Sequence, residues 1–106
     1  MKLMTKEILK KLPPLYSTEG KPKEEIPVVV KYFHPVGRMT YYATEFDPKT
    51  RTLFGFMRSP LGEGYDELGY ASLDEFEAVK GPFGLGIERD LYFGKHTLKE
   101  VMEKAI

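Results

Sequence analysis

The chain has 106 residues, the usual length of a single domain, and its 42% apolar and 30% charged residues are typical of a globular protein. It has no cysteine, its two histidines are far apart, and no apolar run is long enough to cross a membrane or to act as a secretory signal. The lack of cysteine argues against a disulfide scaffold, the separated histidines argue against a metal protein, and the short apolar runs argue against a membrane protein. The formal net charge of zero argues against a general nucleic-acid binder. We therefore expect one cytoplasmic domain over residues 1–106, without metal or cofactor.

One compositional bias indicates a hot environment. The chain contains no Asn and no Gln, and its charges are twelve Glu and twelve Lys against four Asp and four Arg. Asn and Gln are thermolabile, and enrichment in Lys and Glu is the compositional signal of hyperthermophile proteins. We therefore expect that the protein comes from a thermophile.

The amino-terminal half is predicted to form a short helix followed by three strands. Thr5 can cap a helix over residues 6–12, and Pro13-Pro14 ends it because proline lacks the backbone N–H. A polar loop over residues 17–27 follows. Runs of β-branched and aromatic residues then predict three strands, joined by turns into an antiparallel meander. These strands cover residues 28–33, 39–46 and 51–58.

The next segment is predicted to form a fourth strand and a helix. The strand covers residues 67–71. Ser72 and Glu75 after it have the spacing of a capping box, in which each side chain satisfies a backbone N–H at a helix start. This spacing predicts a helix over residues 73–80.

The last segment is predicted to form a strand and a helix. The glycines of residues 81–86 follow a helix and precede a strand, the reverse of a dinucleotide-binding loop, so we interpret them as a structural turn. A strand over residues 87–93 follows. Thr97 and Glu100 repeat the capping-box spacing and predict a helix over residues 98–105. The resulting order, αββββαβα, is that of an α+β fold.

Three blocks of the sequence carry a family resemblance, namely TKEILKKLPPLYSTE, YYATEFDP and LGYASLDEFEAVKGPFGLGIERDLYF. Together they resemble the domain-of-unknown-function 2958 family, whose members are small bacterial and plasmid-borne proteins. The family has no established activity, so the resemblance implies no catalytic residue. The frequent place of its members in plasmids and conjugative elements, beside transfer and anti-restriction genes, implies an accessory factor of mobile genetic elements.

Charge is distributed unevenly along the chain. Residues 63–90 carry two basic and eight acidic residues, a net charge of −6, whereas the remaining segments are mildly basic. Tyrosine and arginine, which anchor protein interfaces, lie among these carboxylates. We expect the two strands of this stretch to lie close together and to present an acidic face to a basic partner protein. The expected partner-binding residues are Tyr65, Asp66, Glu67, Tyr70, Glu88, Arg89 and Asp90.

Two simpler interpretations of the same stretch stay open. Tyr65 and Tyr70 can complete the hydrophobic core, with the acidic residues merely facing water. Arg89 can be a structural partner for Asp66 or Glu67, since an arginine forms two parallel hydrogen bonds with a carboxylate.

An aromatic sheet face would instead favour single-stranded nucleic acid. The run Phe54-Gly55-Phe56-Met57 resembles the core of an RNA-recognition strand, on which bases stack, although the strand order differs from that domain. The residues of this alternative are Tyr41, Tyr42, Phe54, Phe56 and Arg58. Aromatic residues in a sheet more commonly form core and cross-strand pairs, so burial of these rings would exclude the platform.

A small enzyme is the third interpretation. Glu88 and Asp90 alternate with Arg89 on a predicted strand, so the two carboxylates would share one face and could perform acid–base chemistry. The sequence shows no order of Ser, His and Asp and no metal-ligand spacing beside them. A non-enzymatic protein that binds another protein is therefore our first hypothesis.

Overall fold

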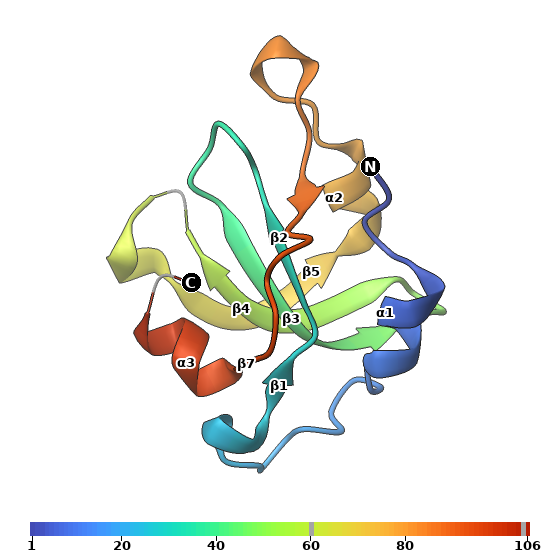
Figure 1. Ribbon diagram of the computed structural model, residues 1–106, viewed down its shortest axis with the longest axis vertical. Helices are drawn as coiled ribbons and strands as arrows, with labels where there is room; N and C mark the ends of the chain where they lie inside the picture. Colours follow the sequence, from blue (N-terminus) through green and yellow to red (C-terminus); the bar gives the residue numbers. More distant parts are fainter. Residues whose placement is uncertain (60, 105) are drawn as a thin grey trace.

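Over the residues that the structure describes, namely 1–59, 61–104 and 106, the centre of the molecule is a five-stranded antiparallel sheet (Figure 1). This is a computed structural model, and at Glu63 and Pro82 it describes the backbone alone. The strands are β2 (Val30–Phe33), β3 (Thr40–Asp47), β4 (Thr52–Arg58), β5 (Glu67–Ser72) and β6 (Glu88–Arg89). Their order in the sheet, β5-β4-β3-β2-β6, confirms the predicted meander and the α+β class.

A small second sheet, also within the described residues, joins the two halves of the chain. β1 (Pro27–Val28) pairs with β7 (His96–Thr97) in antiparallel fashion. The sequence predicted one strand over residues 28–33, but the structure divides it at Val29, whose N–H donates to the carbonyl of Ala43 at 2.9 Å. The pairing of β1 with β7 was not predicted, because a two-residue strand leaves no periodic pattern in the sequence.

Within the described residues, three short α-helices and three single 3-10 turns complete the fold. The α-helices are α1 (Lys6–Lys11), α2 (Leu73–Ala78) and α3 (Leu98–Glu103). The 3-10 turns are η1 (Lys23–Glu25), η2 (Glu63–Tyr65) and η3 (Pro82–Gly84). All three helices form where they were predicted. All three end earlier than predicted, because Leu12, Val79 and Lys104 are extended, and residue 105 lies outside the described residues.

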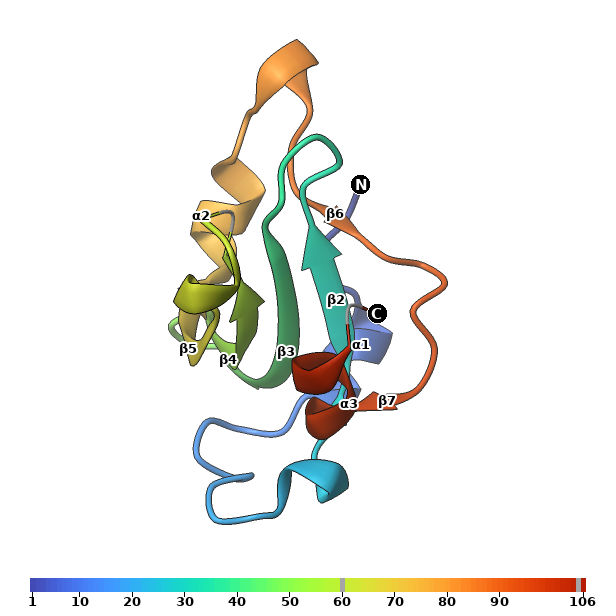
Figure 2. The ribbon, with the colours of Figure 1, turned by 90° about the vertical axis from the view of Figure 1, so that its left-hand side faces the viewer.

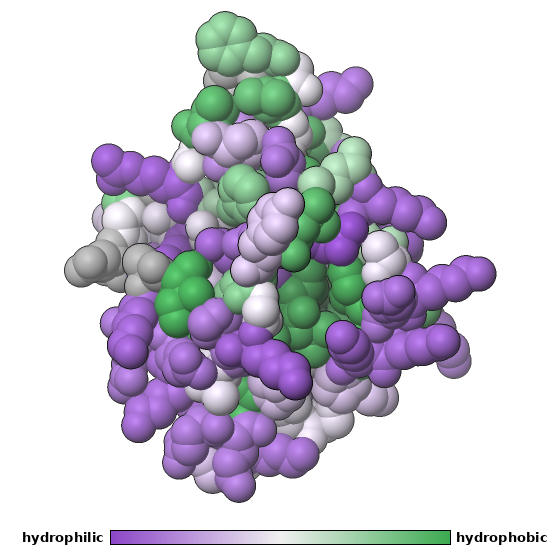
Figure 3. Space-filling view, in the orientation of Figure 1, coloured by the Kyte–Doolittle hydropathy of each residue, from purple (hydrophilic) through white to green (hydrophobic). Residues whose placement is uncertain are grey.

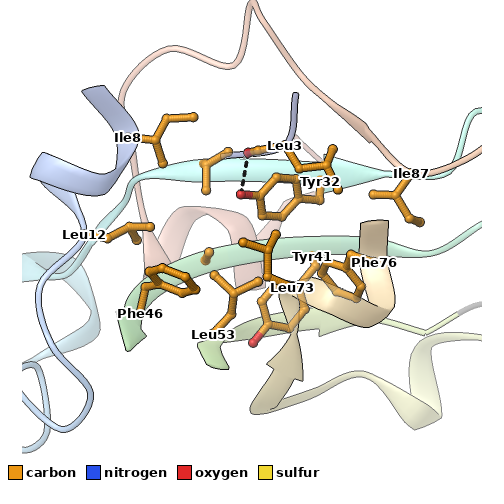
Figure 4. Close-up of a cluster of buried hydrophobic side chains, with 12 residues drawn as sticks. Leu3, Ile8, Leu12, Tyr32, Tyr41, Phe46, Leu53, Leu73, Phe76 and Ile87 are labelled. Atoms are coloured by element: carbon orange, nitrogen blue, oxygen red, sulfur yellow. Dashed lines mark hydrogen bonds between the residues drawn. The ribbon is translucent and has the colours of Figure 1, made fainter. Parts of the chain in front are cut away.

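Each face of the sheet packs against different helices and so builds its own hydrophobic cluster. The first face carries Tyr32 and Tyr41 and is covered by α1, α2 and Leu3 (Figure 4). The second face carries Tyr42 and Phe56 and is covered by α3. α1 and α3 consequently lie on opposite sides of the sheet; in Figure 2, α3 is nearer the viewer and α1 lies behind it.

The glycine-rich segment after α2 is a turn, as predicted, and it protrudes from the body of the molecule (Figure 1). Phe83, in η3, is 93% exposed and has a φ of 62°, a left-handed conformation that is uncommon for a residue other than glycine. The same end of the molecule is apolar on its surface (Figure 3). Gly84, with a φ of 72°, completes the reversal of the chain.

The strand predicted over residues 87–93 is reduced to β6. Asp90 turns the chain, since its carboxylate accepts the N–H of Tyr92 at 2.9 Å, which is the geometry of an Asx turn. Leu91 and Tyr92 are therefore exposed, and only Phe93 returns to the second face. The apolar run of residues 91–93 therefore belongs to a loop of which only Phe93 is buried.

Hydroxyl caps start the two later helices. The Thr97 hydroxyl accepts the Glu100 N–H at 3.2 Å, and the Glu100 carboxylate accepts the Thr97 N–H at 3.1 Å, which completes the predicted capping box. The latter bond holds the pKa of Glu100 below its ordinary value. The Ser72 hydroxyl accepts the Glu75 N–H at 3.2 Å.

Removing either cap should destabilise the protein measurably. We expect Ser72→Ala and Thr97→Ala each to lower the free energy of unfolding by about 0.5–2 kcal/mol, because a first-turn N–H loses its acceptor. Urea denaturation of the variants beside the wild type measures this loss. Thr97→Ser keeps the hydroxyl and is the matched control. A Thr97→Ala protein as stable as Thr97→Ser would contradict the cap.

Two buried tyrosines make the fold sensitive to alkali. Burial raises the pKa of Tyr32 and Tyr41 well above the ordinary value of 10.0. The Tyr32 hydroxyl donates to the carbonyl of Leu3 at 2.7 Å, and that of Tyr41 donates to Gly69 at 2.7 Å. Both hydroxyls therefore stay protonated in the folded protein at a pH where they ionise in the unfolded chain.

This difference predicts a loss of stability at high pH. Because the folded-state pKa of these tyrosines is raised, their protonated hydroxyls stabilise the fold fully below the unfolded-state pKa near 10. This stabilisation is lost as the pH rises toward the folded-state pKa. We expect the free energy of unfolding, measured in urea from pH 9 to 12, to fall more steeply for the wild type than for Tyr41→Phe. Identical slopes for the two proteins would show that Tyr41 ionises equally in both states.

Candidate binding site

The strands that were expected to form one acidic face lie at opposite edges of the sheet. β5 and β6 are separated by β4, β3 and β2. The expectation that Glu67 and Tyr70 lie close to Glu88, Arg89 and Asp90 is therefore wrong. The chain leaves β5 through α2 and the protruding turn and returns beside β2, so nearness in sequence does not become nearness in space (Figure 1).

At the β6 edge, the predicted residues make structural contacts. Arg89 donates from Nε to the carbonyl of Lys2 at 3.2 Å, and its backbone N–H lies 3.1 Å from Sδ of Met1. Asp90 forms an ion pair with Lys31 at 3.5 Å. The amino-terminal segment therefore lies along β6 and covers this edge.

Asp66 has a structural role before β5. Its carboxylate accepts the N–H of Ser59 at 2.8 Å and lies 3.4 Å from Nη1 of Arg58. Arg58 also donates from Nη2 to the carbonyl of Val101 at 2.5 Å, near the end of α3. Asp66 thus pairs with Arg58, and the interpretation that Arg89 is its partner is wrong.

Tyr65, Glu67 and Tyr70 are exposed near the β5 edge. Tyr65 is 63% exposed and Tyr70 is 56% exposed, so the interpretation that they complete the core is wrong. Tyr70 lies opposite Phe54 on β4, and the two rings meet edge to face with centroids 5.1 Å apart. Aromatic and acidic side chains therefore remain accessible on this side of the molecule.

Most of the aromatic rings that the nucleic-acid alternative requires are buried and cannot be reached by a base. Tyr41 lies in the cluster of the first face, and Tyr42 and Phe56 lie in that of the second, and all three are buried. Their rings cannot stack on bases in this arrangement. Of the predicted rings only Phe54 is partly exposed, and Arg58 is bonded to α3.

A β-bulge in β3 positions a carboxylate that the sequence analysis missed. The register between β3 and β4 shifts between Ala43 and Glu45, so Glu45 lies opposite Phe54 on the second face. Strict alternation would have placed it with Ala43 on the first face. Glu45 is only 3% exposed. It is the one charged residue in residues 39–46, a signal that could have identified it.

Glu45 holds the loop after α1 against the second face. Its Oε1 accepts the Tyr16 N–H at 2.8 Å, and its Oε2 accepts the Thr18 N–H at 2.9 Å as well as the Thr18 hydroxyl. Tyr16 has a φ of 71°, a conformation that is unfavourable for a bulky residue and that needs support from its surroundings. The loop places the Tyr16 ring edge to face with Tyr70, with centroids 6.4 Å apart.

These elements surround a pocket of about 310 Å³, which we call the Glu45 pocket. It is lined by Tyr16, Thr18, Glu19, Gly20, Lys21, Lys23, Ile26, Glu45, Phe54, Leu68, Tyr70 and Leu98. Aromatic and aliphatic side chains form most of its wall, and Glu45 adds a buried carboxylate. Its volume lies within the usual range of small-ligand pockets.

Among the described residues that line the Glu45 pocket, Glu45 is the buried charged group, whereas Glu19, Lys21 and Lys23 are exposed. Hydrogen bonding to the Tyr16 side chain raises the pKa of Tyr70, and the charges of Glu45 and Glu19 raise it further. Among the described residues, no lysine or arginine forms an ion pair with Glu45. The three donors that bond to this carboxylate, from Tyr16 and Thr18, are all neutral groups.

A second hollow, of about 530 Å³, lies between α1 and the segment around β7 (Figure 3). It is lined by Lys11, Pro27, Val28, Val29, Gly94, Lys95, His96, Thr97 and Glu100. None of these described residues is a buried carboxylate, a Phe or a Tyr. The Glu45 pocket is therefore the better candidate for a specific site.

The Glu45 pocket also adjoins the open edge of the sheet. Within the described chain, β5 pairs with β4 on one side and has no strand on the other. Leu68 and Tyr70, which alternate along β5, both line the pocket. A six-residue edge strand with unpaired backbone groups is a template for pairing with another chain.

Among the residues that the structure describes, no group of three or more His, Cys, Asp or Glu side chains is arranged to hold a metal ion. In the same described part of the chain, no helix combines the length and the apolar character needed to cross a bilayer.

The fold and the site define a small α+β domain with one open sheet edge beside an aromatic pocket. The family model described as "Protein of unknown function (DUF2958)" matches residues 3–105, and the chain belongs to this family. The family resemblance found in the sequence is thereby confirmed. No curated protein and no solved structure matches the chain significantly.

Proposed function

We propose that the protein is a non-enzymatic binding module that captures an extended segment of another protein along the outer edge of β5. The observation that carries this proposal is the open edge of β5, two of whose side chains line the Glu45 pocket. In strand addition, backbone hydrogen bonds supply affinity, and pockets for alternate side chains supply specificity. An added strand here would lay every second side chain toward the second face, where the pocket lies.

The charges around this edge favour a basic segment. Glu67 is exposed on β5, Glu19 stands at the pocket rim, and Glu45 lies inside the pocket. Complementary charges of this kind raise the association rate and select among partners. Lys21 and Lys23, also at the rim, offset the exposed Glu19 and Glu67, and solvent screens all four charges, so the buried Glu45 is the charge that favours a basic segment.

The other edge of the sheet offers no equivalent site. β6 has only two residues, and Met1 and Lys2 contact Arg89 beside it. The proposed surface therefore keeps Tyr65, Glu67 and Tyr70 of the residues expected from the sequence, and it adds Tyr16, Glu45 and Phe54. The role in mobile genetic elements that the family resemblance implies stays a prediction within this proposal.

Capture of partners from an extract of the native host tests the proposal with matched variants. We expect wild type and Tyr92→Ala to retain the same host proteins, and Tyr70→Ala to lose them by at least about tenfold, since truncating an aromatic anchor costs about 2 kcal/mol or more. Tyr92 is 94% exposed on the loop after β6, away from β5, so Tyr92→Ala controls for the loss of a surface tyrosine.

The comparison also has a result that refutes the proposal. Tyr70→Ala must first show the melting temperature and circular dichroism of a folded protein. A folded Tyr70→Ala variant that retains the same proteins as wild type, at the same strength, would exclude the β5 edge. Retention of single-stranded nucleic acid in place of protein would replace the proposal by the nucleic-acid alternative.

A further inference from the structure

The geometry points to an alkylammonium group, such as the end of a lysine side chain, as the ligand of the Glu45 pocket. This inference deepens the proposed function, because it names the side chain through which the captured segment would be recognised. It stands on the arrangement of three aromatic rings and one buried carboxylate around a single cavity.

The aromatic rings form the walls that a cation requires. Tyr70 meets Phe54 at an interplanar angle of 63° and Tyr16 at 67°, so the rings of Tyr16 and Phe54 that line the cavity lie in different planes from that of Tyr70. The face of an aromatic ring carries negative charge in its quadrupole and attracts ammonium groups within about 6 Å. Sites that recognise quaternary or methylated ammonium groups use several such rings together.

Glu45 supplies the charge that distinguishes this pocket from a purely apolar one. The residue is 3% exposed and is bonded only to neutral donors, those of Tyr16 and Thr18. A buried charge without a counter-ion is unfavourable, and a ligand cation beside it would compensate that charge. The aliphatic wall, formed by Ile26 and Leu98, suits the methylene or methyl groups that an alkylammonium carries.

The rim lysines define the competing possibility. Lys21 and Lys23 could draw an anion to the mouth of the pocket. Both are exposed, whereas the carboxylate is buried, and electrostatic interactions are stronger in the less polar interior. The interior charge therefore decides which ligand enters, and we expect a cation.

Two small molecules of the same shape, one charged and one neutral, separate the contribution of charge to binding from that of shape, and no partner protein is needed. Choline carries a trimethylammonium group, and 3,3-dimethylbutan-1-ol has the same shape without the charge. Each is titrated into the full chain while the aromatic NMR signals of Tyr16, Phe54 and Tyr70 are followed. We expect choline to shift these signals and to bind at least about tenfold more tightly than the neutral alcohol.

Three variants test whether choline binds in the Glu45 pocket. Glu45→Gln should reduce choline affinity at least about tenfold while leaving the alcohol nearly unchanged, and Tyr70→Leu should do the same by removing a ring face but keeping an apolar wall. Tyr92→Ala should bind choline as the wild type does. If Glu45→Gln does not fold, Tyr70→Leu alone carries the test, because Tyr70 is half-exposed.

Each of the other outcomes overturns either this inference or the proposed function. Equal affinity for choline and the alcohol would make the site a plain apolar pocket. Shifts of the same signals by inorganic phosphate, with none by choline, would assign the site to an anion through Lys21 and Lys23. Choline binding together with unchanged host capture by Tyr70→Ala would keep the cation site and refute the proposed function, so the two failures are distinguishable.

Discussion

Gly55→Ala is expected to lower the free energy of unfolding by about 3 kcal/mol or more, because the added methyl group makes the tightest backbone contact of any glycine in the chain. A Cβ atom at Gly55 would lie 2.0 Å from the carbonyl oxygen of Tyr42 and 2.9 Å from Cα of Ala43. Both neighbours are backbone atoms of the adjacent strand, so no side-chain rotation can relieve the overlap. The strands would have to separate at the bulge that positions Glu45.

The partner of Gly55 across the sheet provides the control. Gly69 lies opposite it on β5, and a Cβ atom there would meet no atom within 4 Å. Gly69→Ala should therefore leave stability within about 0.5 kcal/mol of the wild type. Chemical denaturation of the two variants in parallel measures both values. Equal stability of Gly55→Ala and Gly69→Ala would show that β3 and β4 do not approach as closely as described.

Glu45→Ala is expected to destabilise the protein by about 1.5–3 kcal/mol and to release the loop after α1, because hydrogen bonds to a charged acceptor are strong and three of them end on this carboxylate. Tyr16 would then leave its unfavourable backbone conformation, since no bond would hold it there. The Glu45 pocket would lose one of its walls along with its charge.

Amide hydrogen exchange measures the release of this loop residue by residue. The N–H groups of Tyr16 and Thr18 should exchange much faster in Glu45→Ala than in the wild type, whereas those in β4 should change little. Glu19→Ala removes an exposed carboxylate from the same loop and should leave both rates unchanged. Protection of Tyr16 and Thr18 in Glu45→Ala equal to that in the wild type would mean that Glu45 does not hold the loop.

Local patterns predicted most of the regular structure of this protein. Strand β4 follows a run rich in residues that favour strands, and the starts of α2 and α3 follow the hydroxyl caps at Ser72 and Thr97. Each of these signals acts within a few residues of the chain. The bulge at Ala43 and Glu45 could not be predicted in this way, because it depends on how β3 meets β4.

The acidic stretch shows why charge along a sequence is a poor guide to a surface. Asp74 and Glu77 in α2 bind Arg51, at 2.6 Å and 2.5 Å, and Asp66 binds Arg58. Chain reversal after α2 then carries the rest of the stretch to the opposite edge of the sheet. Long-range pairing of this kind has no local signature, so a single face assembled from residues 63–90 could not form.

A photo-crosslinking derivative of phenylalanine at position 70, which keeps the aromatic ring of Tyr70, tests most directly the central claim that β5 and the Glu45 pocket form the binding surface. The same amino acid at position 92 is the control, since both side chains are tyrosines exposed at the surface. After irradiation in host extract, we predict protein adducts from position 70, with the crosslinked peptide containing a lysine next to the site of attachment, and no such adducts from position 92. Adducts of equal abundance from both positions, or adducts from position 92 alone, would contradict the account.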